Sequence, residues 1–154
     1  MGEIIVKLSG KSTDEFWRLR KELLTELEEI NKEADSSELE SATKQYYLSH
    51  INKDLICWGI LQEDRIAAIG SLCLFTRIPY EENVTGLEGY ILNIYTSPQF
   101  RGHGLANCIL EEIIKYAQGA GVKRLWLNSS EHAKELYAKR GFRRKDNEME
   151  LFLS

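Results

Sequence analysis

A short glycine-containing loop between a strand-like segment and a long helical segment constrains this chain more than any other feature. Residues 89–95 are rich in aromatic, β-branched and large apolar side chains, and after a Ser-Pro break the loop at 99–104 reads Gln-Phe-Arg-Gly-His-Gly. Beyond it, apolar residues recur at positions 105, 106, 109, 110, 113, 114 and 117, the spacing of one helical face. The sequence therefore predicts a strand, a glycine turn and a helix in direct succession.

This loop has two interpretations. A glycine loop that opens a helix exposes backbone N–H groups at the positive end of the helix dipole, and such a place binds phosphate. Glycine also supplies the geometry of an ordinary strand-to-helix turn, and a short Gly-x-Gly is a weak signal by its length. The loop alone leaves both interpretations open.

Length and composition indicate a single soluble domain. A chain of 154 residues can bury one core of ordinary size, and no repeat or linker divides it. No apolar run reaches the roughly 18 residues of a membrane span, and the first eleven residues lack the apolar centre of a signal peptide. We expect one domain over residues 1–154, a cytoplasmic location and no membrane partner.

Cysteine spacing and charge exclude further classes of protein. Cys57, Cys73 and Cys108 lie far apart in apolar patterns, which favours buried, reduced thiols over a disulfide framework or a zinc site. The net charge is −4 and no basic stripe exceeds the short cluster at residues 143–145, so nucleic acid is not an expected partner. Residues 99–154 nevertheless carry ten Lys and Arg against seven Asp and Glu. This excess suits an anionic ligand near the glycine loop, unless the charges merely cover solvated helix faces.

Hydrophobic periodicity and turn residues predict the element order βααβββαβαβ. Strands are expected at 3–8, 55–62, 65–77, 88–96, 122–128 and 147–153, and helices at 14–34, 37–52, 105–118 and 131–140. Glu63-Asp64 marks a hairpin turn between the second and third strands, and each of the two later helices connects strands. The expected fold class is α/β (α+β), with a mixed, mostly antiparallel central sheet flanked by helices.

Two motifs then make the chain resemble the GNAT family of acyl-CoA N-acetyltransferases. Residues 99–106, Gln-Phe-Arg-Gly-His-Gly-Leu-Ala, resemble the family's Gln/Arg-x-x-Gly-x-Gly/Ala signature, and residues 136–142, Leu-Tyr-Ala-Lys-Arg-Gly-Phe, are similar to its Leu-Tyr-x-x-x-Gly-Phe ending. The element order extends the resemblance to essentially the whole chain. It implies a GNAT-like fold, acetyl-CoA as co-substrate, no metal, and transfer of the acetyl group to a primary amine by direct attack on the thioester.

The resemblance also implies how acetyl-CoA is held. Backbone N–H groups from Arg101 to Ala106 would bind the pyrophosphate, which Gly102 and Gly104 can approach closely because they lack a Cβ. The pantetheine arm would lie between the strands at 88–96 and 122–128, which splay apart in this family, and would pair with the free edge of the first.

Further contacts follow from the same resemblance. An N–H of Ile94, Tyr95 or Thr96 would polarise the thioester carbonyl. Many members carry an asparagine seven residues before the motif tyrosine; here that position is Ser130, and Asn128 could serve instead. His103 is expected to face solvent without a catalytic role. The full set of expected cofactor-binding residues is Ile94, Tyr95, Thr96, Gln99, Arg101, Gly102, His103, Gly104, Leu105, Ala106, Asn128, Ser130 and Tyr137.

The chemistry needs an acid and a base. Tyr137 matches the family tyrosine that protonates the departing CoA sulfur, although a core tyrosine is the alternative. Glu88 lies eleven residues before Gln99, a spacing similar to that of the glutamate base in lysine-acetylating members. Glu81, Glu82 or a chain of waters are the other candidates for the base.

The sequence says least about the acceptor substrate. The two N-terminal helices are rich in Asp and Glu, and an acidic, aromatic pocket would favour a cationic amine, such as a polyamine, an aminoglycoside, a lysine or a peptide N-terminus. The aromatic residues available are Trp17, Tyr46, Tyr47, Trp58 and Tyr80. The alternative function is a non-catalytic acyl-CoA-binding sensor, and a homodimer remains open.

Overall fold

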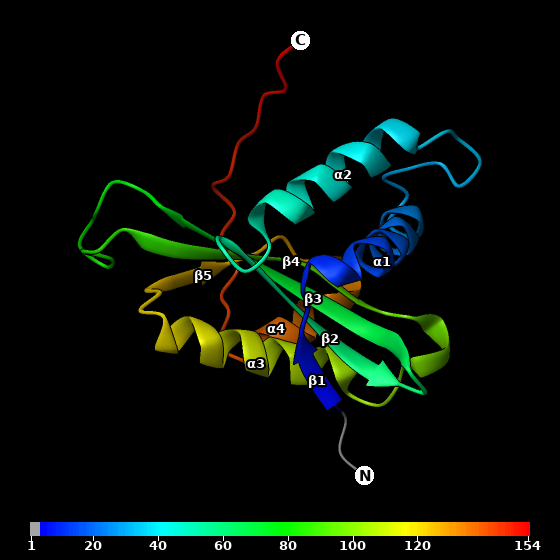
Figure 1. The fold of residues 1–154 in the computed structure, drawn as a ribbon. Helices are drawn as coiled ribbons and strands as arrows, with labels where there is room; N and C mark the ends of the chain where they lie inside the picture. Colours follow the sequence, from blue (N-terminus) through cyan, green and yellow to red (C-terminus); the bar gives the residue numbers. More distant parts are fainter. Residues whose placement is uncertain (1–3) are drawn as a thin grey trace.

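The computed structural model describes residues 4–154 and shows a five-stranded sheet with helices on both faces (Figure 1). In their order across the sheet, the strands are β1 (Ile4–Lys7), β2 (Leu55–Gln62), β3 (Arg65–Thr76), β4 (Leu87–Thr96) and β5 (Arg124–Trp126). The helices are α1 (Thr13–Glu26), α2 (Ser37–His50), α3 (Leu105–Gly119) and α4 (Lys134–Ala138), with 3-10 turns at Gly10–Ser12, Pro98–Phe100 and Glu131–Ala133. β1 to β4 pair antiparallel, whereas β4 and β5 pair parallel. The predicted mixed, mostly antiparallel sheet is confirmed.

The hairpin between β2 and β3 forms where the sequence predicts it. Glu63 and Asp64 have φ angles of 53° and 63°, and two left-handed residues in succession match the twist of the strands on either side. The local signal is therefore sufficient to place this turn.

Side chains from the two faces of the sheet form two apolar clusters, because successive strand residues point to opposite faces. Below the sheet in Figure 1, α3 and α4 cover one face, and Leu72 and Ile91 pack there with Ile109 and Ile113 of α3. On the opposite face, α1 and α2 cover a second cluster, which includes Phe16, Leu19, Tyr47, Leu55 and Ile69. Among the described residues, no helix has the length and apolar character to cross a bilayer.

β4 contains a bulge that the sequence does not predict. Leu92 lies opposite Ser71 and Tyr95 lies opposite Ile69, so β4 has one residue more than β3 across this step. Asn93 adopts a left-handed φ of 60° there, which asparagine tolerates better than most residues. As a result, Leu92 and Asn93 both line the same pocket, although neighbours in a regular strand point to opposite faces.

Three boundaries differ from the prediction. The helix expected at 14–34 ends at Glu26, because Glu28 turns left-handed with a φ of 61° and the N–H groups of Glu29 and Ile30 bond back to the carbonyl of Leu24. No glycine marks this end. The strand expected at 122–128 is shortened to Arg124–Trp126, and the helix expected at 131–140 is a 3-10 turn followed by α4.

The strand expected at 147–153 is wrong for the single chain. These residues form no strand, and Figure 1 shows the C-terminal segment running away from the body. The side chains of Met149, Leu151, Phe152 and Leu153 are 83% to 94% exposed. Alternating side chains specify a strand-like segment but not its partner, and within residues 4–154 no strand pairs with this segment.

Candidate active site

The glycine loop presents its backbone to solvent at the start of α3. Gly102 and Gly104 have φ angles of 87° and 75°, and a Cβ on either would meet nothing within 4 Å. Residues 101–104 are exposed, whereas Leu105 is only 2% exposed and anchors the helix in the core. The first N–H groups of a helix have no acceptor within it, so the loop and the first turn of α3 offer free donors with room for an anion beside them.

The Arg101 side chain connects this loop to α1. Its Nε donates to the Thr96 carbonyl at 2.9 Å, and its Nη2 donates to Glu26 at 2.7 Å. The guanidinium carbon also lies 5.4 Å from the centre of the Tyr95 ring, and the Tyr95 hydroxyl donates to Glu22 of α1 at 3.2 Å. The Arg101 and Tyr95 side chains therefore face α1, and what they can offer a cofactor is their backbone.

β4 and β5 separate after a short stretch of pairing. Only Glu88, Gly89 and Tyr90 of β4 pair with β5, so the part of β4 from Ile91 to Thr96 has no partner strand on that side among the described residues. These unpaired backbone groups lead directly toward the glycine loop. Such an edge can bind an extended, amide-bearing ligand in the manner of an added strand.

The other predicted cofactor residues lie around this opening. Asn128 follows β5 and donates its Nδ2 to the Tyr90 hydroxyl at 3.2 Å. Ser130 precedes the 3-10 turn at Glu131–Ala133 without capping it by its side chain. Gln99 and His103 are exposed, and Ala106 is half-buried in the first turn of α3.

Tyr137 lies in α4, within the apolar cluster that the sheet forms with α3. Its side chain is 9% exposed, and its ring packs edge-on against Phe142 with the ring centres 5.8 Å apart. Burial raises the pKa of Tyr137 above its ordinary value. A protonated phenol is suited to donate a proton.

Glu88 lies in β4 in a different environment. Its side chain is fully buried, accepts hydrogen bonds from the Tyr80 hydroxyl and from Arg124 Nη1, the latter at 3.0 Å, and lies 3.8 Å from Arg77 Nη1. Burial acts to raise the pKa of Glu88, but the bonds from Tyr80 and Arg124 outweigh it and lower the pKa. The role of Glu88 as the base stays a prediction, and these contacts weigh against it. Glu81 and Glu82 are exposed on the loop before β4.

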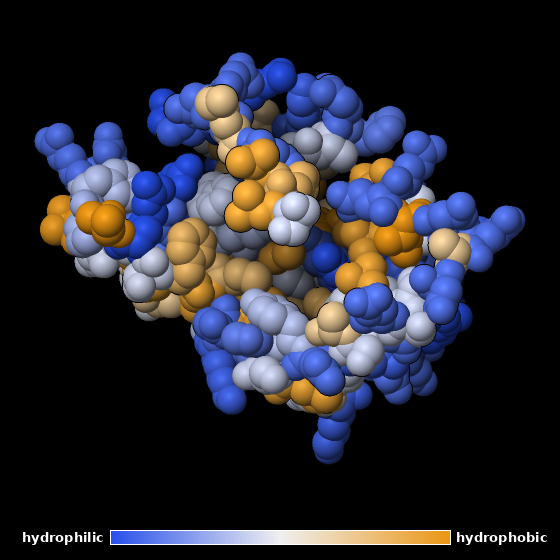
Figure 2. All heavy atoms as spheres, turned by 90° about the horizontal axis from the view of Figure 1, so that it is seen from above, coloured by the Kyte–Doolittle hydropathy of each residue, from blue (hydrophilic) through white to orange (hydrophobic). Residues whose placement is uncertain are grey.

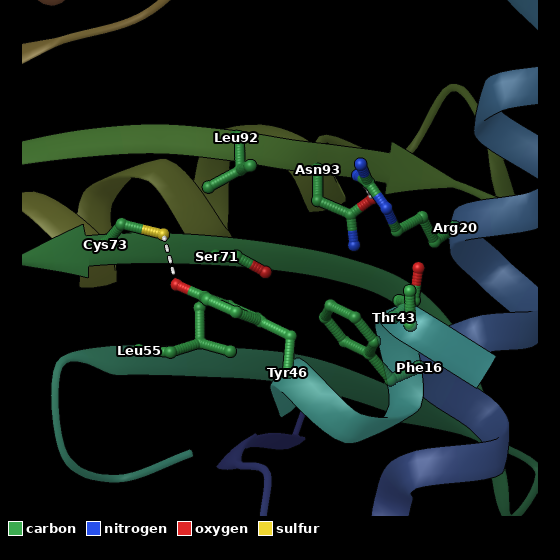
Figure 3. Close-up of a pocket in the computed structure, with 10 residues that line it drawn as sticks. Phe16, Arg20, Thr43, Tyr46, Leu55, Ser71, Cys73, Leu92 and Asn93 are labelled. Carbon is green, nitrogen blue, oxygen red and sulfur yellow. Dashed lines mark hydrogen bonds between the residues drawn. The ribbon is translucent and has the colours of Figure 1, made fainter. Parts of the chain in front are cut away.

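A pocket of about 230 Å³ opens on the α1 and α2 face of the sheet, beside the β4 bulge. Figure 2, which looks down on this side of the molecule, shows a hollow with apolar residues in its floor. The residues that line the pocket are Phe16, Arg20, Ala42, Thr43, Tyr46, Leu55, Ser71, Cys73, Leu92 and Asn93 (Figure 3). None of these ten residues is an aspartate or glutamate.

The pocket differs from the one that the sequence suggests. Of the expected aromatic walls, only Tyr46 lines it, whereas Trp17, Tyr47 and Trp58 are buried in the core. Arg20 and Asn93 were missed. The signal for Arg20 is a charge four residues after Phe16, on the apolar face of a predicted helix, and the signal for Asn93 is an amide within an apolar strand. Across residues 4–154, no cluster of His, Cys, Asp and Glu could hold a metal ion.

Comparisons with known proteins agree with this geometry. The sequence model of the Acetyltransferase (GNAT) family matches residues 17–142 of this chain. The fold superposes with a TM-score of 0.85 on a predicted acetyltransferase from Clostridium acetobutylicum crystallised with acetyl-CoA, at 26% identity over 98% of this chain and 96% of that one. A glucosamine-6-phosphate N-acetyltransferase from Arabidopsis thaliana has a TM-score of 0.73 at 22% identity over the full length of both chains, a likeness of fold.

One curated relative also matches in sequence. It is a glucosamine 6-phosphate N-acetyltransferase from Trypanosoma brucei brucei, which is 31% identical over 65 residues. The match spans 42% of this chain and 44% of that relative. The family match, by contrast, includes both the glycine loop and the tyrosine motif. The chain therefore belongs to the Acetyltransferase (GNAT) family, whose members are acyl-CoA-dependent N-acyltransferases that use acetyl-CoA.

Proposed function

We propose that the protein transfers the acetyl group of acetyl-CoA to the primary amine of a small molecule, by direct attack of the amine on the thioester. The observation that carries this proposal is the separation of β4 from β5, which places a free strand edge between the glycine loop and the pocket. A cofactor that lies along this edge from the loop brings its far end to the β4 bulge. An amine in the pocket approaches the same bulge from the α1 and α2 face.

The residues of the chain divide the work of binding. The backbone N–H groups from Arg101 to Ala106 bind the pyrophosphate, although that of Arg101 also donates to the Pro98 carbonyl at 3.3 Å. The edge of β4 holds the pantetheine amides. Acetyl-CoA supplies an activated acyl thioester. An N–H of Ile94, Tyr95 or Thr96 donates to the thioester oxygen and stabilises the negative charge that develops there.

Proton transfers complete the reaction. The buried, protonated Tyr137 donates to the departing sulfur and regains a proton from solvent. The ammonium form of the acceptor loses one proton before it attacks, and its nitrogen loses a second proton from the tetrahedral intermediate. Because Glu88 is enclosed by Tyr80, Arg124 and Arg77, we favour a route through water to solvent over direct transfer to that carboxylate.

The first test is the melting temperature with acetyl-CoA, with ATP as the control. A ligand at about 100 times its dissociation constant stabilises a protein by roughly 2.7 kcal/mol, which for a domain of this size is about 5 to 10 °C. We expect a shift with acetyl-CoA and none with ATP, followed by thiol release in the presence of primary amines. No shift at millimolar acetyl-CoA would contradict the proposal, and a shift without turnover of any amine would favour the non-catalytic sensor.

A further inference from the structure

Arg20 is a half-buried cation in the pocket wall, and among the described residues it forms no ion pair. It projects from α1, and its Nη1 donates to Asn93 Oδ1 at 3.3 Å (Figure 3). Across the described part of the chain, residues 4–154, no carboxylate forms an ion pair with it. Burial lowers the pKa of Arg20, and the charge of Glu29 offsets this only in part. A guanidinium withdrawn from water without an anion is costly, so the pocket gains stability when an anion enters.

Asn93 supplies a second donor without a partner. Its side chain is 6% exposed, and its Nδ2 is buried without a hydrogen bond to any described residue. Since the amide oxygen accepts from Arg20, the amide nitrogen is left to face the pocket, as Figure 3 shows. A buried donor without an acceptor costs about 1–3 kcal/mol, and an acceptor atom on a ligand would remove that cost.

We propose that Arg20 and Asn93 form a subsite for an anionic group of the acceptor, so that the substrate is a small primary amine that also carries a carboxylate or a phosphate. This inference rests on the proposed function. An oxyanion can accept hydrogen bonds from the free N–H groups of Arg20 and from Asn93 Nδ2 together. Hydrogen bonds in which a partner is charged are stronger than those between neutral groups. A polyamine would find no carboxylate among the lining residues.

The rest of the pocket limits the size and polarity of the acceptor. Its volume of about 230 Å³ lies below the roughly 300 to 1,000 Å³ of sites for drug-sized ligands. Phe16, Leu55 and Leu92 give it apolar walls. Asn93 directly precedes Ile94, so an anion on Arg20 and Asn93 holds the acceptor beside the stretch of β4 that we assign to the thioester.

The decisive experiment compares pairs of amines that differ only in the anion, using thiol release from acetyl-CoA. L-leucine against L-leucinamide tests the carboxylate, and glucosamine 6-phosphate against glucosamine tests the phosphate. We expect the wild type to prefer the anionic member of at least one pair. Arg20→Gln should raise KM for that member about 10- to 100-fold, the range for a lost charged hydrogen bond, with a smaller change for its neutral counterpart.

Control variants separate the subsite from general damage. Arg18→Gln removes a guanidinium two residues away that pairs with Glu15 and Glu22, and it should keep the wild-type preference. Arg20→Lys retains the charge but loses the planar set of N–H donors of the guanidinium. Its KM for the anionic amine should therefore lie between those of the wild type and Arg20→Gln. If Arg20→Gln folds poorly, a raised KM in Arg20→Lys still tests the subsite.

A binding measurement does not depend on turnover. With CoA saturating the glycine loop, millimolar phosphate or acetate should raise the melting temperature of the wild type and of Arg18→Gln but not that of Arg20→Gln. Equal kinetics for anionic and neutral amines, or equal anion shifts in all variants, would overturn the subsite and leave the proposed acetyl transfer intact. The absence of any acetyl-CoA shift would instead overturn the proposed function.

Discussion

A phenol in the apolar cluster that the sheet forms with α3 keeps its proton throughout the neutral range, because burial disfavours the phenolate. Tyr137 is such a group. We expect Tyr137→Phe to lower kcat about 100-fold, in the range for loss of a general acid, with little change in affinity for acetyl-CoA. Because its pKa is raised, the wild-type rate should fall only above roughly pH 10, and this fall should be absent in the variant.

A second tyrosine on the same side of the sheet provides the control. Tyr116 of α3 packs edge-on against Trp58, with ring centres 5.3 Å apart, and has no proposed part in the reaction. Tyr116→Phe should keep the wild-type rate and pH profile. An unchanged kcat in Tyr137→Phe would remove this residue from the mechanism.

The charge of Glu88 is expected to stabilise the fold rather than the reaction. Its pKa is lowered in the folded state, so its contribution is present above the unfolded value of roughly 4.3 and is lost as the pH falls through the folded value. Glu88→Gln should reduce the free energy of unfolding at pH 7 by about 1–3 kcal/mol and should weaken the loss of stability in acid. Urea unfolding at pH 7 and in acid measures both effects.

The rate profile of the same variant decides its catalytic role. We expect the shape of the pH–rate profile to be kept in Glu88→Gln, with Glu63→Gln on the exposed turn between β2 and β3 as the control. If the rate falls about 100-fold and the low-pH limb disappears, Glu88 is the base after all.

At the scale of elements, α3 lies so close to the sheet that β3 needs a residue without a side chain. A Cβ on Gly70 would lie 2.4 Å from Ile109 Cγ2. Gly70→Ala should therefore cost about 1–3 kcal/mol of stability, as overpacked cores do. Gly119→Ala, at the end of α3 where a Cβ meets nothing within 4 Å, should instead stabilise by about 0.4–1 kcal/mol. Equal denaturation midpoints for the two variants would contradict this packing.

The elements that the sequence predicts well are those with local causes. The turn at Glu63-Asp64, the glycine loop and the start of α3 at Leu105 each depend on residues within a few positions of one another. The end of α1 was misplaced because a left-handed Glu28 carries no sequence signal like that of glycine. The bulge at Asn93 was missed because it depends on the register with β3.

In the candidate site, too, the residues that can be predicted are those with a local sequence signal, and the others depend on contacts between distant segments. The loop and Tyr137 can be named as candidates from the sequence because each lies within a contiguous motif, and their roles stay predictions. Arg20 and Asn93 are 73 positions apart, and only the packing of α1 across β4 brings them together. The expectation of a cationic acceptor came from acidic residues that the fold uses elsewhere, such as Glu26, which binds Arg101.

At the scale of the whole molecule, the C-terminal segment carries a large apolar surface without cover. The exposed side chains of Met149, Leu151 and Leu153 recur at every second residue in the manner of a strand, and Phe152 between them is exposed as well. Exposed apolar patches of this kind mark sites of association. We expect the full chain to self-associate and a chain that ends at Asp146 to be monomeric, as measured by light scattering. Equal masses per particle for the two chains would contradict the expectation.

The unpaired edge of β4 has a consequence for the abundance of the protein in the cell. An open strand edge is a template for pairing with other chains, and a bound pantetheine arm would cover it. Ligand binding also draws molecules away from the unfolded forms that proteases remove. A cell short of acetyl-CoA is therefore expected to hold less of this protein as well as less of its acetyl donor. The supply of acetyl-CoA would then change the rate of amine acetylation in two ways, through the concentration of the donor and through the amount of enzyme.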